Sequence, residues 1–208
     1  MKKLIVSLTL ALAAFPALAQ NAEQMFDKLL QGIRQDGISC EGTIRNADDP
    51  NDPGNKVSLV MKAEKYCIRL SESTYWYDGK YGWNGIGSDY NINEVYISEP
   101  DDDELSSNPF VLLMNREAFN ISATDGRTLA LTAKDQVKGV YGALSLKLRF
   151  TDEGRPLQIT MDMLISEKSR NVFRTVTDIS SFKTSVTDDS VFTFQKSKWP
   201  DAEIIDLR

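Results

Sequence analysis

Short segments in which apolar and polar residues alternate make up most of the sequence. From Leu144 to Phe150, for example, every second residue is apolar, and the residues between them are Ser145, Lys147 and Arg149. Alternation with a period of two places one set of side chains on each face of a β-strand. About a dozen such segments follow one another, which predicts consecutive antiparallel strands. A sheet of that size twists, so it must close on itself or hold a helix against its concave side.

Two segments have a helical pattern instead. In the segment from Asn21 to Arg34, Asn21 and Gln24 have the spacing of a capping box, and the apolar residues share one stripe: Met25, Phe26, Leu29, Leu30 and Ile33. The run from Pro109 to Met114 is short and wholly apolar, with proline in its first turn and a cap expected within residues 106–108. A short apolar helix between strands needs a groove to cover.

We therefore predict a mainly β (α+β) fold, in which a strongly curved antiparallel sheet forms a half-open β-barrel. The N-terminal helix and the inserted helix, which acts as a lid, are expected to cover its concave face. Asp78-Gly79 and Asp125-Gly126 are hairpin turns in this scheme, and Val191 to Phe194 is the last strand. Without an internal repeat or a linker-like stretch, residues 20–208 are predicted to form a single domain.

The first 19 residues have the pattern of a secretory signal peptide. Lys2 and Lys3 precede an apolar run from Leu4 to Ala14, and Ala17-Leu18-Ala19 is a small-x-small cleavage pattern. The apolar run is too short to span a membrane, and no cysteine follows the cut to carry a lipid. We expect cleavage after Ala19 and a protein that is free in the periplasm.

Composition excludes several classes of function. The 24 Lys and Arg residues against 30 Asp and Glu give a net charge of −6, and loss of the two signal-peptide lysines leaves about −8. An acidic chain without a basic block argues against binding to nucleic acid or to anionic lipid. The absence of histidine excludes Ser-His-Asp and Cys-His catalysis and histidine-ligated metal. We predict no enzymatic activity, no catalytic residues, no cofactor and no metal; a hydrolase is the least favoured reading, because no nucleophile and base are suitably arranged.

Cys40 and Cys67 are the two cysteines, and export makes a disulfide chemically possible. Alternation argues against it, because Cys40 shares a face with Ile38 while Cys67 lies opposite Tyr66 and Ile68. In a meander of three strands the two cysteine strands are also not neighbours, so the Cα separation exceeds the bridging limit of roughly 7 Å. Since strand order is itself inferred, both states stay open.

Two acidic loops could offer oxygen ligands to calcium: one holds Asp48, Asp49 and Asp52, and the other runs from Asp101 to Glu104. Neither has an EF-hand pattern, so solvated loops are the favoured interpretation. The glycosylation pattern Asn120-Ile121-Ser122 falls in a predicted strand of a chain with a bacterial type of signal.

The order of these features resembles a known family. After the signal and the amphipathic helix come Asp78-Gly79-Lys80 with Trp83, then Asn108 to Leu113, and finally Phe192-Thr193-Phe194. This order is similar to that of the periplasmic outer-membrane lipoprotein carriers (LolA-type) over almost the whole mature chain. The ending Ala202 to Arg208 resembles the variant found in Bacteroidetes-type bacteria.

The resemblance implies a monomeric, non-enzymatic shuttle built on an unclosed β-barrel. Such a carrier takes the acyl chains of acylated lipoproteins from an inner-membrane lipoprotein-releasing transporter and passes them to an outer-membrane acceptor. The lid would be Phe110, Val111, Leu112, Leu113 and Met114. The cavity would be lined by Leu59, Met61, Ile68, Leu70, Trp83, Leu146, Leu148, Met161 and Met163. For any single one of these residues ordinary core is the favoured interpretation, whereas for the lid run as a whole the two interpretations are balanced.

One feature of the family is missing. The arginine of an Arg-Pro pair latches the lid in better-studied carriers, whereas the matching turn here reads Met61 to Tyr66 without arginine. Lys62 and Arg69 are the candidate substitutes, although lysine lacks the guanidinium fork. The alternative function, from another class, is a cell-envelope sensor or interaction domain on the same half-barrel.

Overall fold

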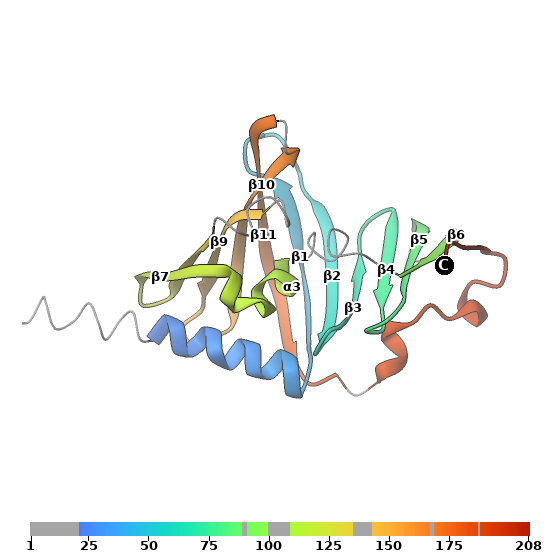
Figure 1. Cartoon of the computed structure of the whole chain (residues 1–208), viewed down its shortest axis with the longest axis horizontal. Helices are drawn as coiled ribbons and strands as arrows, with labels where there is room; N and C mark the ends of the chain where they lie inside the picture. The colour runs from blue at the N-terminus through green and yellow to red at the C-terminus, as the bar shows by residue number, and fades with distance from the viewer. Residues whose placement is uncertain (1–20, 89–90, 100–108, 135–142, 167–168, 187) are drawn as a thin grey trace, which may run out of the picture.

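The computed structural model describes residues 21–88, 91–99, 109–134, 143–166, 169–186 and 188–208. In these residues twelve strands form one unclosed sheet (Figure 1), in the order β12-β6-β5-β4-β3-β2-β1-β11-β10-β9-β8-β7. The strands are β1 (Ile38–Asn46), β2 (Asn55–Lys62), β3 (Lys65–Arg69), β4 (Ser73–Tyr77), β5 (Gly82–Ser88), β6 (Asn91–Ser98), β7 (Phe119–Asp125), β8 (Thr128–Ala133), β9 (Ala143–Phe150), β10 (Pro156–Ser166), β11 (Ser169–Thr184) and β12 (Glu203–Asp206).

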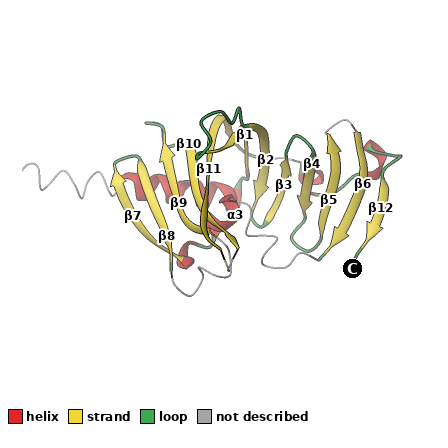
Figure 2. Cartoon of the chain, turned by 90° about the horizontal axis from the view of Figure 1, so that it is seen from above, coloured by secondary structure: helices red, strands yellow, loops and turns green. Residues whose placement is uncertain are grey.

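The sheet consists of two antiparallel meanders placed side by side (Figure 2). One is β1 to β6 and the other is β7 to β11, and they join where β1 pairs with β11. A bulge interrupts this ladder at Glu41 and Gly42, where a Cβ on Gly42 would lie 2.3 Å from the carbonyl oxygen of Asp178. Only glycine fits so close an approach. The junction of the two meanders therefore requires Gly42.

One face of the sheet, the inner face, carries the two predicted helices. The N-terminal helix covers residues 21–35, and α3 (Pro109–Met114) lies between β6 and β7. Phe26, Ile33, Leu112 and Leu113 pack in one buried cluster with inward side chains of both meanders. The predicted fold, a curved and unclosed β-barrel with helices on its inner face, is confirmed.

The opposite, outer face has a second buried cluster, which the sequence analysis did not predict. Its buried members are Cys67, Trp76, Ile92, Val95 and Ala202. Phe194 and Trp199 cover Trp76, with ring centroids 5.6 and 5.5 Å from it. The C-terminal segment therefore crosses the outer face of β3 to β6, and β12 then pairs with β6 in parallel.

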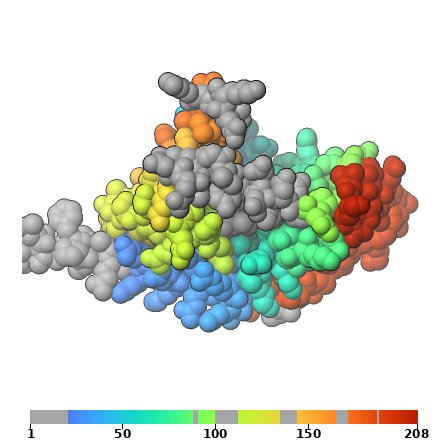
Figure 3. Space-filling model, viewed as in Figure 1, coloured from blue at the N-terminus to red at the C-terminus, as the bar shows by residue number. Residues whose placement is uncertain are grey.

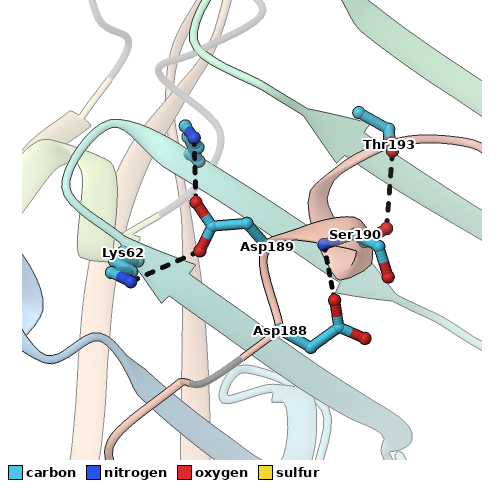
Figure 4. A network of polar contacts seen from close by, with 6 residues as sticks. Lys62, Asp188, Asp189, Ser190 and Thr193 are labelled. Carbon is cyan, nitrogen blue, oxygen red and sulfur yellow. Dashed lines mark hydrogen bonds and ion pairs between the residues drawn. The ribbon is translucent and has the colours of Figure 1, made fainter.

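The predicted strand Val191 to Phe194 is wrong. The chain forms the 3-10 helix η2 (Asp189–Phe192) there, followed by η3 (Lys196–Lys198). The Asp188 carboxylate accepts a hydrogen bond from the Ser190 amide and caps η2 (Figure 4), while Phe192 is fully buried. A cap and one buried anchor outweigh the β-propensity of the local sequence.

An ion-pair network fastens this C-terminal segment to the β2–β3 turn (Figure 4). The Asp189 carboxylate lies 3.2 Å from Lys65 Nζ and 3.3 Å from Lys62 Nζ. These two ammonium groups, Lys65 first, lower the pKa of Asp189. The backbone amide of Ala63, in the same turn, donates a hydrogen bond to the carbonyl oxygen of Ile33 in the N-terminal helix. The turn thus connects the elements of both faces.

The two cysteines do not form a disulfide, as alternation favours. Cys40 belongs to the inner cluster and Cys67 to the outer one, with β2 between their strands. Burial raises the pKa of the Cys40 thiol to about 12. A buried, protonated thiol is a poor nucleophile.

We expect no thiol to react with a disulfide reagent at pH 8 in the native protein, and both to react after denaturation without reductant. Unfolding exposes the sulfurs and returns the Cys40 pKa to its ordinary value. Colorimetric thiol titration measures this directly. Absence of reactive thiol in the denatured, unreduced protein would show that the cysteines are bridged.

Candidate functional site

The lid candidate is a helix whose apolar side chains enter the inner core. Leu112 and Leu113 are 3% and 0% exposed, and the partly buried Met114 packs against the same cluster. The side chains of Phe110 and Val111 and the expected cap at 106–108 lie outside the described residues. The predicted helix is confirmed, and its role as a lid stays a prediction.

Seven of the nine predicted lining residues converge on this inner cluster. Five are buried there and two are partly buried against it: Leu59, Met61, Leu146, Leu148 and Met161, and then Ile68 and Met163. They come from β2, β3, β9 and β10, which belong to different meanders. The β1–β11 junction therefore brings them together under α3.

Two predicted lining residues are placed elsewhere. Trp83 pairs with Trp76 and packs on the outer cluster, because the register of the β4–β5 hairpin turns both side chains to the outer face. A shift of one residue in register would reverse that face, and the sequence does not determine the register. Leu70 lies beyond the end of β3 and is 41% exposed. The prediction that both line a buried cavity is wrong.

A hollow of about 460 Å³ lies at the C-terminal end of α3, where Met114 and Asn115 contribute to its lining. Its lining consists of Met61, Ala63, Glu64, Tyr66, Tyr77, Met114 and Asn115. The volume falls in the range of roughly 300–1,000 Å³ that is typical of ligand sites. Most of its wall is apolar, so it can accept an aliphatic chain that leaves a polar end at Glu64 or Asn115.

Tyrosines form one wall of this hollow, and the sequence analysis did not select them. The Tyr66 ring lies 5.4 Å from that of Tyr77 and 5.8 Å from that of Tyr75, between centroids. Burial raises the pKa of the Tyr77 phenol, with Glu64 and Asp78 adding to the effect. The phenol stays neutral at physiological pH. The alternation of Tyr66 with Ile68, and of Tyr75 with Tyr77, was the available signal.

A larger hollow of about 600 Å³ has a different lining and belongs to the outer face of β1, β2 and β3. Charged and hydroxyl side chains contribute to it, among them Glu41, Lys56, Ser58 and Arg69. Such a lining does not suit an acyl chain. The smaller, apolar hollow beside α3 is therefore the candidate site.

The two expected substitutes for the latching arginine point to the outer face of the sheet, whereas α3 packs on the inner face. Lys62 is paired with Asp189, and Arg69 is opposite Ser58 on the outer face. Arg116, in the 3-10 helix η1 (Arg116–Ala118) directly after α3, forms an ion pair with Asp27 of the N-terminal helix. Its guanidinium also lies 5.8 Å from the Phe26 ring centroid. Arg116 thus ties the end of the lid segment to the N-terminal helix.

The first acidic loop uses its carboxylates for turns. Asp52 accepts from the Asn46 and Gly54 amides, which lower its pKa, and Asp49 accepts from the Asn51 amide. The second loop and the cleavage site lie outside the described residues. In the described part of the chain, no group of three or more His, Cys, Asp or Glu side chains could hold a metal. No helix described there has the length and apolarity needed to cross a membrane.

No protein-family model and no curated protein matches the chain. Among solved structures, it is similar to a LolA superfamily protein from Nitrosomonas europaea, with 14% identity, a TM-score of 0.41, and coverage of 83% of this chain and 97% of that one. A DUF1329 family protein from Desulfovibrio piger has 13% identity, a TM-score of 0.40, and coverage of 86% and 97%. A chain of the Pseudomonas aeruginosa MucA/MucB complex is also similar, with 14% identity, a TM-score of 0.38, and coverage of 83% of this chain and 61% of that one.

Arg116→Ala should loosen α3 with little effect on overall stability. An exposed ion pair contributes about 0–1 kcal/mol and an exposed cation–π contact about 0.5–1 kcal/mol. Amide hydrogen exchange in residues 109–118 should accelerate several-fold. Arg127→Ala, which removes an exposed ion pair with Asp152 in another hairpin, is the matched control. Equal exchange of α3 in both variants would show that Arg116 does not hold the lid.

Proposed function

We propose that the protein is a periplasmic carrier that binds an acyl chain of a lipoprotein, or another lipid, between α3 and the inner face of the sheet. One observation carries the proposal: Leu112 and Leu113 occupy the inner core, and a hollow of about 460 Å³ lies at the end of their helix. If α3 swings out, its side chains vacate an apolar space that joins this hollow.

The energetics suit a carrier that must also release its cargo. Burial of each CH₂ contributes about 0.8 kcal/mol, so one fully buried chain of roughly sixteen carbons would contribute about 13 kcal/mol. Binding of that strength would scarcely reverse. In the closed form, Leu112 and Leu113 already cover the apolar wall, so the cost of opening α3 offsets part of the gain. Methionines such as Met61 and Met161 adapt to irregular flexible chains.

In this proposal the carrier moves acylated lipoproteins from an inner-membrane transporter to an outer-membrane acceptor. The order of motifs along the chain supports that route. The same half-barrel could serve as a sensor or interaction domain. Such a domain would change its affinity for a protein partner when a ligand binds. The two functions differ in whether bound acyl chains are exchanged reversibly.

Native mass spectrometry of the mature protein, purified from the envelope without detergent, tests the proposal. We expect a co-purifying acylated species that added fatty acid or lipopeptide displaces. A clean mass that also fails to take up added acyl ligand would make the inner face an ordinary core, and the interaction domain would become the better function.

Leu112→Asp should weaken acyl binding at least tenfold while the sheet stays folded. In the loaded form Leu112 of the displaced α3 would cover the acyl chain, and a carboxylate there would put a charge against an apolar chain. This loss would exceed the gain from a lid that opens more easily. Fluorescent fatty-acid titration measures the affinity, and far-UV circular dichroism measures the fold. Asn120→Asp, which adds the same charge at an exposed position of β7, is the control. Wild-type affinity in Leu112→Asp would disprove the lid assignment.

A further inference from the structure

The wall of the hollow beside α3 has a buried part and an exposed rim. Met61 and Tyr66, which are 1% and 2% exposed, form the buried part. Ala63, Glu64 and Asn115 are exposed and form the rim. In the space-filling view, the turquoise segment of β2 and β3 reaches the surface next to the blue N-terminal helix (Figure 3). An acyl chain in the hollow therefore places its apolar part against the buried wall and its polar end at the rim.

The charge of this rim is negative. Among the described residues that line the hollow, Glu64 is the one Asp, Glu, Lys or Arg side chain. A second carboxylate, that of Asp78, acts together with Glu64 on the Tyr77 phenol of the same wall: burial raises the pKa of this phenol most, and the two negative charges raise it further. The exposed Glu117 follows the rim residue Asn115 by two positions. The polar end of a bound chain would therefore lie among carboxylates.

The basic side chains that adjoin the rim in the sequence already have acidic partners. Lys62 and Lys65, on either side of the β2–β3 turn, both pair with Asp189 of the C-terminal segment (Figure 4). Arg116, directly after α3, pairs with an aspartate of the N-terminal helix. No ion pair between described residues includes Glu64. The negative charge of Glu64 thus remains available to a ligand.

The β2–β3 turn holds Glu64 in a defined position. Ala63 has a φ of 51°, a left-handed conformation that is uncommon for residues other than glycine. Its amide donates a hydrogen bond of 2.8 Å to the carbonyl oxygen of Ile33 in the N-terminal helix. The two lysines of the turn are fixed on the opposite side by Asp189. Contacts on both sides therefore fix the backbone that carries the Glu64 side chain.

We propose that Glu64 sets the charge selectivity of the hollow, so that chains with an uncharged or positively charged polar end bind better than anionic lipids such as free fatty acids. A second carboxylate at the rim is disfavoured because like charges repel, and the apolar wall beside them strengthens the repulsion. An ammonium group at the same place is attracted instead. This selectivity rests on the acyl binding proposed above and names the class of chain that fits.

Displacement of an uncharged fluorescent dye, phenylnaphthylamine, from the mature protein tests the proposal. The competitors are dodecylammonium, dodecanol and dodecanoate at neutral pH and low salt, which share one chain length and differ in charge. We expect wild-type affinity to decrease in that order. In Glu64→Gln the affinity for dodecanoate relative to dodecanol should rise about three- to fivefold, as the loss of one partly screened charge allows. Comparing the two proteins cancels the different hydration of the probes, and added salt should reduce the effect.

Two further variants separate Glu64 from general effects of charge. Glu72→Gln removes the same charge at an exposed position beyond the opposite end of β3, so it should keep the wild-type ratio of affinities. Glu64→Lys should make dodecanoate bind more tightly than dodecylammonium. Thermal unfolding confirms that each variant is folded.

The outcomes distinguish this selectivity from acyl binding itself. An unchanged ratio of dodecanoate to dodecanol affinity in Glu64→Gln, or an equal change in Glu72→Gln, would overturn the role of Glu64 and leave acyl binding standing. If dodecanol does not displace the dye from the wild-type protein, the proposed acyl site is wrong and the selectivity falls with it.

Discussion

The pairing of β1 with β11 is the interaction on which the rest of the structure depends. It joins two meanders whose contributing strands are far apart in the sequence, from Ile38 opposite Thr184 to Asn46 opposite Thr175. Closing so long a loop costs conformational entropy, which a continuous ladder and the helices packed on it offset. The lining side chains from β2 and β10 share one core only because this junction exists. Gly42 permits the close approach within it.

The C-terminal segment determines which side chains remain for the candidate site. Phe194 and Trp199 bury Trp76 on the outer face, and alternation then turns Tyr75 and Tyr77 inward. Tyr77 becomes a wall of the hollow beside α3. The ion pairs of Lys62 and Lys65 with Asp189 hold the β2–β3 turn in place. The same turn contributes Ala63 and Glu64 to the lining of that hollow. The outer cluster thus supports the geometry of the inner face.

A folded sheet can gather basic side chains on one face even when the net charge of the whole chain is negative. The chain is acidic and has no basic run, so its sequence argued against attraction to anionic lipid. Alternation, however, places Lys147 and Arg149 on the outer face of β9, and Lys56 and Lys183, from distant segments, lie on the same face of the sheet. A basic surface formed in this way is invisible to any count along the chain.

The sequence by itself determined the type of nearly every element, because period and turn chemistry are local properties. The alternation from Leu144 to Phe150, the apolar stripe of the N-terminal helix, and Asp78-Gly79 each act over a few residues. The tertiary structure alone decided that Trp83 points to the outer face of the sheet and that Leu70 is exposed. It also decided that Asp189–Phe192 is helical and that Arg116 pairs with Asp27. These depend on strand register and on partners remote in sequence, which the free energy of the whole packed molecule selects.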